Sequence, residues 1–293
     1  MKNLIPRFIA ENNKKGIYHG RIKAGAMFAD ISGFTAITET LANKGKEGAE
    51  ILSVIINGVF SPCIKSVYER GGFIISFEGD AFIALFPRDY RNCISAAYDI
   101  INIFRVQHRK STKYGEFNVF AKVGLSFGEI EWGIAGSIEK KTYYFRGQAI
   151  DGCSLAERHC SLMDVVIDKS LHERLTGSGI FEKIGDGFYK APRVDIKGKT
   201  KDIDQYDIDD GALNIFVPSL LTDTKPPDEL RDIVSAYISF RDVDRDHQSL
   251  SSFSADILDI AYKWGGYFNQ IGFDDKGGNA VSYTHLRAHE TVL

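Results

Sequence analysis

The sequence predicts an α+β protein with a ferredoxin-like architecture, in which helices pack on an antiparallel-rich sheet. Three observations support this fold class. Residues 24–30 (AGAMFAD) are apolar up to a final carboxylate, which is typical of a strand buried on both faces. Two short apolar runs, FIISF and AFIALF, are joined by Glu78-Gly79-Asp80 and predict a hairpin with an acidic turn. Amphipathic stretches on both sides of this hairpin predict helices.

The first helical stretch follows the strand that ends at Asp30. Its apolar residues recur at spacings of three and four, and Gly71-Gly72 predicts its end. Pro62 is expected to kink or split this helix. These recurring residues are Leu52, Ile55, Val59, Cys63 and Val67.

The remaining elements alternate between helix and strand. Residues 90–110 predict a second amphipathic helix, and residues 117–136 predict a strand, a glycine-containing turn and another strand. Further strands are expected at residues 142–150, at 164–167 and around Ile184. We expect all the helices to pack on one face of the sheet.

An internal repeat divides the chain. We expect a first domain at residues 1–210, then a linker and an incomplete second copy at 211–281. SAYISFRD echoes GAMFAD, and YKWGGYFNQIGFDD echoes YERGGFIISFEGD. Residues 282–293 break the repeat, and we expect them to be a non-native tail. The echo aligns Phe28 with Phe240, Asp30 with Asp242, and Ser76 with Gln270.

The bulk composition argues against several classes of protein. The 36 basic and 39 acidic residues leave a net charge of -3, so we expect neither nucleic-acid nor membrane binding. The N-terminus lacks the apolar core of a signal peptide, and we find no segment expected to span a bilayer. The four cysteines lack paired short spacings and are expected to be buried thiols. We therefore expect a cytoplasmic protein.

Two acids carry the predicted chemistry. Asp30 and Asp80 end adjacent elements, so the hairpin should bring them close together. Paired carboxylates hold divalent cations, and two such ions can activate an attacking hydroxyl and stabilise a leaving phosphate. The alternative is that each is a solvated turn acid.

The loop after Asp30 strengthens the phosphate interpretation. Its small residues would let backbone N–H groups approach a phosphate at a helix N-terminus. The alternative role for Ser32 or Thr35 is a helix cap. Lys122, within the apolar run FAKVGL, would add a positive charge near the phosphates, although an isolated strand lysine is often only solvated. The loop residues are Ile31, Ser32, Gly33, Phe34 and Thr35.

Four segments in this order, FADISGFTAITE, GGFIISFEGDAFIALF, AKVGLSFGEI and YYFRGQAIDGCSLAE, resemble the first catalytic domain of soluble adenylate cyclases, within the class III nucleotidyl cyclase family. The resemblance implies the class III cyclase fold and conversion of ATP to cyclic AMP and pyrophosphate. It implies that Asp30, Asp80 and the Ile31 carbonyl bind two Mg²⁺ or Mn²⁺ ions, and that the loop residues and Lys122 hold the triphosphate. A second cyclase domain of the same full-length chain would supply the base-contacting residue, at Gln270 here, and further transition-state groups.

Departures from the family pattern leave alternatives. Gln270 replaces a family lysine, which leaves the choice between ATP and GTP open and makes a catalytically silent, cyclase-like sensor the main alternative. A diguanylate cyclase is disfavoured because residues 77–80 do not reproduce its hairpin motif. We expect the 293-residue chain alone to make essentially no cyclic nucleotide, since it lacks the segment that bears the transition-state arginine of the second domain. Self-association is not expected to replace that arginine, because Leu155 stands near its position and Arg158 is a poor substitute.

Overall fold

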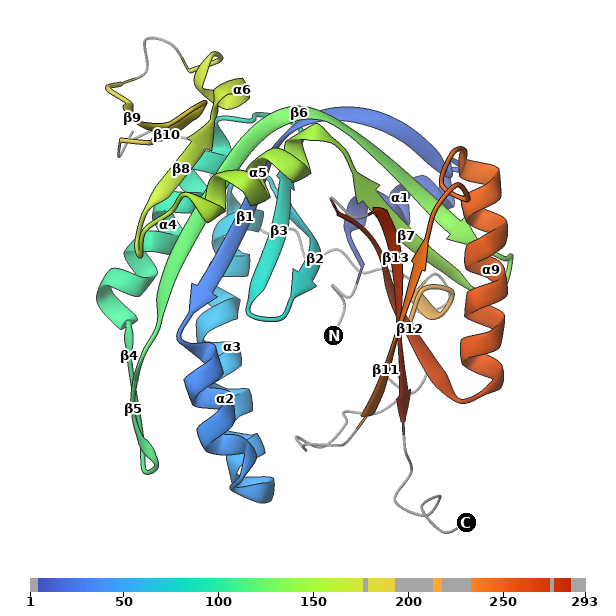
Figure 1. Ribbon diagram of the computed structural model, residues 1–293, viewed down its shortest axis with the longest axis horizontal. Helices are drawn as coiled ribbons and strands as arrows, with labels where there is room; N and C mark the ends of the chain where they lie inside the picture. The colour runs from blue at the N-terminus through green and yellow to red at the C-terminus, as the bar shows by residue number, and fades with distance from the viewer. Residues whose placement is uncertain (1–4, 176–178, 193–212, 218–232, 275–276, 286–293) are drawn as a thin grey trace.

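The computed structural model describes residues 5–175, 179–192, 213–217, 233–274 and 277–285. Two sheets organise these residues (Figure 1): a large one built from the first part of the chain and a small one near the C-terminus. The mixed α and β content and the largely antiparallel pairing confirm the predicted fold class. The predicted domain boundary at residue 210 lies outside the described residues.

The large sheet has eight strands in the order β2-β3-β1-β6-β8-β10-β9, with β7 paired to the far end of β6. All these pairs are antiparallel except β6 with β8. Its strands are β1 (His19–Ser32), β2 (Phe73–Glu78), β3 (Ala81–Phe86), β6 (Phe120–Gly136), β7 (Lys141–Arg146), β8 (Val165–Asp168), β9 (Glu182–Gly185) and β10 (Phe188–Lys190). A separate hairpin pairs β4 (Arg109–Thr112) with β5 (Gly115–Asn118).

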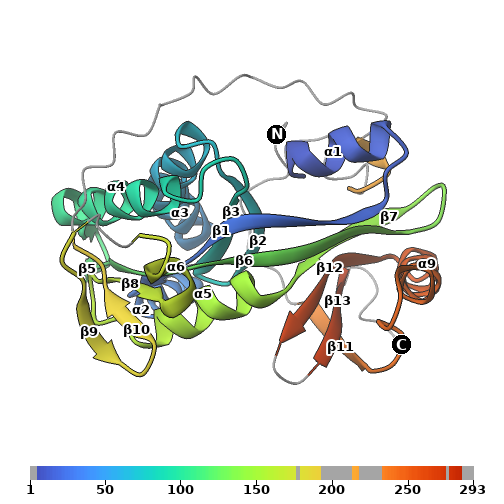
Figure 2. The ribbon, with the colours of Figure 1, turned by 90° about the horizontal axis from the view of Figure 1, so that it is seen from above.

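Helices cover both faces of this sheet, so the expectation that all of them share one face is wrong. Figure 2 shows α3 and α4 on one side of β1 and β6, and α5 on the other. In β1, Met27 and Ala29 belong to the core under α3 and α4, whereas Ala24 and Ala26 belong to the core under α1 and α5. The strand is thus buried on both faces, as its apolar run predicts. The helices are α1 (Arg7–Lys14), α2 (Phe34–Ala42), α3 (Gly45–Glu69), α4 (Asn92–Gln107), α5 (Gln148–Arg158) and α6 (Lys169–His172).

The long helix α3 ends as the sequence predicts. Gly71 adopts φ 76°, its N–H bonds to the carbonyl of Tyr68, and the N–H of Gly72 bonds to the carbonyl of Val67. These bonds form a Schellman motif. Of the two outcomes expected at Pro62, a split does not occur, because α3 continues through it.

By length and composition alone α3 qualifies as a membrane span, contrary to the expectation from the sequence. Such helices are also common in protein cores, and α3 packs its apolar stripe against the sheet.

Strand β6 differs from the prediction. Residues 120–136 form one continuous strand rather than two strands and a turn. Its glycines serve close packing instead of chain reversal: a Cβ on Gly124 would lie 2.2 Å from the carbonyl oxygen of Cys153 in α5. The expected strand at residues 142–150 is also shorter, because β7 ends at Arg146 and α5 begins after Gly147, whose φ is 135°.

The cysteines are free thiols. Cys63, Cys93 and Cys153 are buried and Cys160 is half-buried, which confirms the expectation for three of the four. Burial raises the pKa of the Cys63 thiol to about 12, so this group stays protonated at neutral pH.

The internal repeat is visible in the small sheet. It contains β11 (Ile233–Phe240), β12 (Gly266–Asp274) and β13 (Gly277–His285), and α9 (His247–Lys263) connects β11 to β12. The order β11-β13-β12 matches β1-β3-β2 in the large sheet. Both copies carry a register shift at the same place, before Ser76 in one and before Gln270 in the other. This confirms the alignment of those two residues.

The same register corrects another part of the alignment. Ser76 pairs with Ile83, which pairs with Phe28, and Gln270 pairs with Val281, which pairs with Tyr237. Tyr237, not Phe240, is therefore the counterpart of Phe28. Two residues further along the strands, the counterpart of Asp30 is Ser239 and not Asp242. Strand β13 also continues to His285, so residues 282–285 of the expected tail lie in the strand; the non-native origin of the tail stays a prediction.

Candidate functional site

Asp30 and Asp80 meet at one end of the large sheet. Asp30 is the last residue of β1 that pairs with β3, and its partner is Ala81, the first residue of β3. The N–H of Ile31 donates a hydrogen bond of 3.0 Å to the backbone carbonyl of Asp80, across the turn that Gly79 makes at φ 67°. The predicted neighbourhood of the two acids is therefore confirmed. Since the N–H and C=O of an extended residue point to the same side, the Ile31 carbonyl also faces this turn.

A lysine opposite Asp30 holds its carboxylate. Lys122 is its cross-strand partner on β6, and its Nζ lies 3.0 Å from Asp30 Oδ2. The Ser32 hydroxyl donates to the same oxygen at 3.1 Å. Lys122 also donates to Glu157 Oε1 on α5 at 2.5 Å. Burial alone would lower the pKa of Lys122, but its hydrogen bonds to Glu157 and Asp30 outweigh burial and raise that pKa. The lysine is therefore a cation shared by two carboxylates.

Glu157 is a site residue that the sequence reasoning missed. Its side chain is only 11% exposed, and it reaches Lys122 because α5 lies directly on β6. Gly124 permits this approach, since a Cβ there would lie 2.3 Å from the Glu157 backbone nitrogen. A glycine within a strand is one signal of such a close approach, but it fits a turn equally well, so Gly124 alone does not locate the helix.

The loop after Asp30 has the backbone that its glycine predicts. Gly33 adopts φ 104°, and a Cβ on it would lie 2.3 Å from the Asn118 carbonyl oxygen. Helix α2 begins at Phe34, which is buried, while Thr35 is exposed. Within the described chain, no side-chain hydrogen bond caps this N-terminus, so the alternative of a cap made by Ser32 or Thr35 is wrong. The first backbone N–H groups of α2 therefore begin four residues after Asp30.

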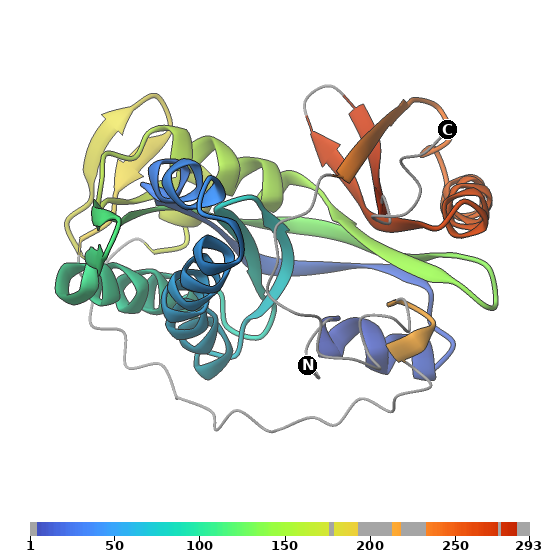
Figure 3. The same cartoon turned by 90° about the horizontal axis from the view of Figure 1, so that it is seen from below.

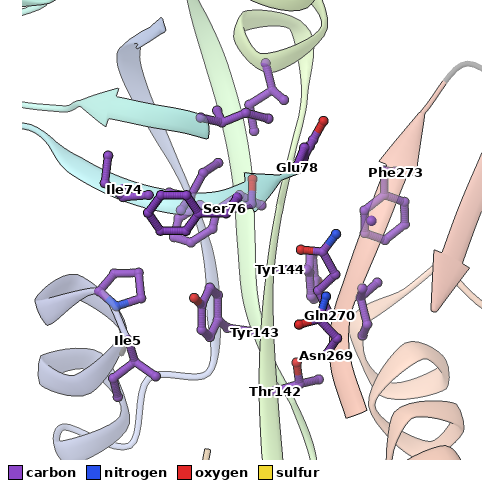
Figure 4. Close-up of a pocket in the computed structure, with 18 of the residues that line it drawn as sticks. Ile5, Ile74, Ser76, Glu78, Thr142, Tyr143, Tyr144, Asn269, Gln270 and Phe273 are labelled. Carbon is purple, nitrogen blue, oxygen red and sulfur yellow. The ribbon is translucent and has the colours of Figure 1, made fainter. Parts of the chain in front are cut away.

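Gln270, on β12, lines two neighbouring cavities. Together with Ser76 it lines a cavity of about 270 Å³ between β2 and β12, where Figure 4 shows the two residues on opposing strands. A larger neighbouring cavity of about 730 Å³ is also lined by Gln270, with Phe28, Arg158 and Tyr237 among its other residues. Asp30, Asp80 and Lys122 do not line either cavity. Gln270 therefore shares the larger cavity with Glu157 and Gly79, but not with Asp30, Asp80 or Lys122.

A family model of the adenylate and guanylate cyclase catalytic domain matches residues 19–209, well over half of the chain. The chain belongs to this family. Adenylate cyclase type 10 from Rattus norvegicus is 32% identical over 167 residues, which cover 55% of this chain and 10% of the relative. A terminal-differentiation-specific adenylate cyclase from Dictyostelium discoideum is 25% identical over 212 residues, covering 70% of this chain and 10% of the relative. The chain thus spans about a tenth of the length of these curated relatives.

A solved structure of a bacterial light-regulated adenylyl cyclase shares the fold, with a TM-score of 0.53 and 20% identity. The similarity covers 72% of this chain and 62% of that one.

Within this cyclase domain and its repeat, the acids occur only in the first copy at the compared positions. The strand register places Ser239 where Asp30 stands and Gly278 where Asp80 stands. Asp242 lies beyond the strand end and forms an exposed ion pair with Arg245 at 2.5 Å. The two copies of the repeat are therefore not equivalent in chemistry.

Proposed function

We propose that this chain carries the metal-binding half of an adenylate cyclase, which converts ATP to 3′,5′-cyclic AMP and pyrophosphate by in-line attack of the ribose 3′-hydroxyl on the α-phosphate. The observation that carries the proposal is the meeting of Asp30 and Asp80 beside the glycine turn that begins α2. Family membership supports the reaction class. The choice of ATP is supported by the adenylate cyclases among the relatives.

The donor set at this end of the sheet fits Mg²⁺ or Mn²⁺. Two carboxylates and a backbone carbonyl are hard oxygen ligands, which these ions prefer. Asp30, Asp80 and the Ile31 carbonyl would hold two such ions. The bonds from Lys122 and Ser32 occupy one oxygen of Asp30, and a carboxylate has acceptor capacity on both. When bound, the ions would favour loss of the hydroxyl proton and neutralise charge on the leaving pyrophosphate.

The chain's own residues would bind and orient the triphosphate. Gly33 lets the loop turn at φ 104° into helix α2, and the N-terminus of α2 favours negative charge. Lys122 would remain protonated. Its ammonium group would then bind the phosphates in addition to Asp30 and Glu157. Gln270, on the second copy, would contact the base through its amide. A second cyclase domain of the complete protein would supply the remaining groups.

Gln270 also favours the second candidate, a catalytically silent cyclase-like sensor or regulatory domain, because an amide replaces the charged side chain that the family resemblance implies at this position. Purified complete protein, incubated with Mn²⁺ and either ATP or GTP, decides between the readings when products are separated by chromatography. We expect cyclic AMP from ATP. A preference for GTP would overturn the substrate assignment, and nucleotide binding without any cyclic product would favour the silent domain.

A further inference from the structure

The junction between the two copies of the repeat combines an apolar core with polar contacts, among them those of one arginine and a hydrogen bond from the Gly136 N–H to Ser251 Oγ. The long hairpin of β6 and β7 extends beyond the other strands of the large sheet and lies against α9 and β12 (Figure 3). Ala135 and Tyr144 from this hairpin belong to the same apolar core as Phe240 and Leu258 of the second copy. This apolar contact brings the copies together without a directional bond, so their relative orientation depends on polar groups at its margin.

Arg146, the last residue of β7, supplies such groups. Its guanidinium donates to Glu131 Oε1 within the first copy, at 2.7 Å from Nη2 and 3.1 Å from Nε. It also donates to Asp244 of the second copy, reaching the backbone carbonyl from Nη1 at 3.1 Å and Oδ2 at 3.2 Å. The guanidinium carbon lies 4.9 Å from the ring centroid of Phe273 on β12. One rigid, planar group therefore contacts a loop and a strand of the second copy at once.

On each copy, the residues in this contact are close along the chain to an element that carries a site residue. On the first copy, Arg146 is separated only by Gly147 from α5, the helix that carries Glu157, the partner of Lys122. On the second copy, Phe273 lies three residues after Gln270 on the same strand. A change at Arg146 would therefore alter how the strand that presents Gln270 sits relative to the helix behind the acid cluster.

The partly buried environment of Arg146 and its two acidic partners suits a role in orienting the two copies. The side chains of Arg146, Glu131 and Asp244 are 23%, 29% and 29% exposed, so water competes for their hydrogen bonds less than at the open surface. The nearby pair of Arg21 and Glu129 is 67% and 49% exposed and lies entirely within the first copy. Exposed pairs of this kind contribute little to stability.

We propose that Arg146 is a positioning residue that fixes the second cyclase copy on the first, through its simultaneous bonds to Glu131 and Asp244 and its stacking on Phe273. The effect on catalysis rests on the proposed function, but the effect on geometry does not. Lysine cannot replace it, because a single ammonium lacks the planar fork that reaches both carboxylates and the ring.

A distance measurement tests the geometry on its own. Spin labels are attached to cysteines placed at Val106 on α4 and at Trp264 after α9, which are 82% and 76% exposed, in a complete protein carrying Cys160→Ser. Arg146→Gln should shift or broaden the distance distribution between the labels, and Arg21→Gln should leave it unchanged. An unchanged distribution in Arg146→Gln would refute the proposal.

Turnover of the same variants then tests the catalytic consequence. A misplacement of about 1 Å can cost up to about 100-fold in rate, so kcat of Arg146→Gln should fall by about 10- to 100-fold. Arg146→Lys should not restore it, and Mn²⁺ affinity at the first copy should be unchanged. If kcat stays at the parent value while the distance changes, Arg146 does not position the catalytic halves. If the parent makes no cyclic nucleotide, the proposed function fails while the distance result still stands.

Discussion

Replacing Lys122 by methionine should destabilise the first cyclase domain, because it leaves two carboxylates facing each other without their shared cation. Lys122 lies 3.0 Å from Asp30 and 2.5 Å from Glu157, whose side chains are 20% and 11% exposed. Removing one partner of a buried ion pair costs about 3–5 kcal/mol, and partial hydration of Asp30 reduces this to about 2–3 kcal/mol. For a domain of this size, that corresponds to a fall in Tm of roughly 5–10 °C.

Thermal unfolding followed by circular dichroism measures this change, with Lys23→Met, an exposed lysine on the same sheet, as the control. Adding Glu157→Gln to the Lys122 variant removes one of the unpaired charges and should recover more than half of the lost stability. If Lys122→Met is as stable as the parent, or if Glu157→Gln brings no recovery, the shared-cation account is refuted.

Three further predictions concern backbone space and pH. Gly33→Ala should cost about 2–4 kcal/mol in urea unfolding, because its φ of 104° and a 2.3 Å contact both oppose a side chain; a neutral result would contradict the loop geometry. Gly124→Ala should push α5 away from β6 and cost about 3 kcal/mol or more, whereas Gly58→Ala, in open space on α3, should be neutral or stabilising. Burial, and secondly the neighbouring His19, lower the pKa of His247 from 6.5. Protons then bind the unfolded state more readily, so stability should fall as the pH drops through 6.5 and stop falling below the folded-state pKa. His247→Gln should flatten this slope, and an unchanged slope would exclude His247 as its source.

Much of the first copy follows from local sequence. The apolar run before Asp30, the acidic hairpin turn and the glycine pair after α3 are short-range signals, and each specifies its own backbone. The meeting of Asp30 with Asp80 then follows from the pairing of β1 with β3. These signals were sufficient to place the two acids together.

The errors share one physical cause, which is that packing between distant segments leaves little trace in local pattern. Gly124 has the same sequence signature whether it makes a turn or admits a helix, and only the position of α5 decides. From the sequence alone, Glu157 is expected to be an exposed residue of a surface helix. Its burial becomes evident only when that helix is placed on β6. The alignment of Asp242 with Asp30 rests on the similarity of two short sequences. The strand pairing shows instead that Ser239 is the counterpart of Asp30.

The measurement that tests the central claim most directly compares two matched variants of the complete protein, Asp30→Asn and Asp242→Asn, in cyclic AMP formation over a Mn²⁺ titration. Each removes one carboxylate charge with little change in shape, and asparagine tolerates the φ of 70° at Asp242. We expect Asp30→Asn to abolish turnover with the fold intact by circular dichroism, and Asp242→Asn to keep parental activity. Parental activity in Asp30→Asn would contradict the assignment of the metal-binding half to the first copy.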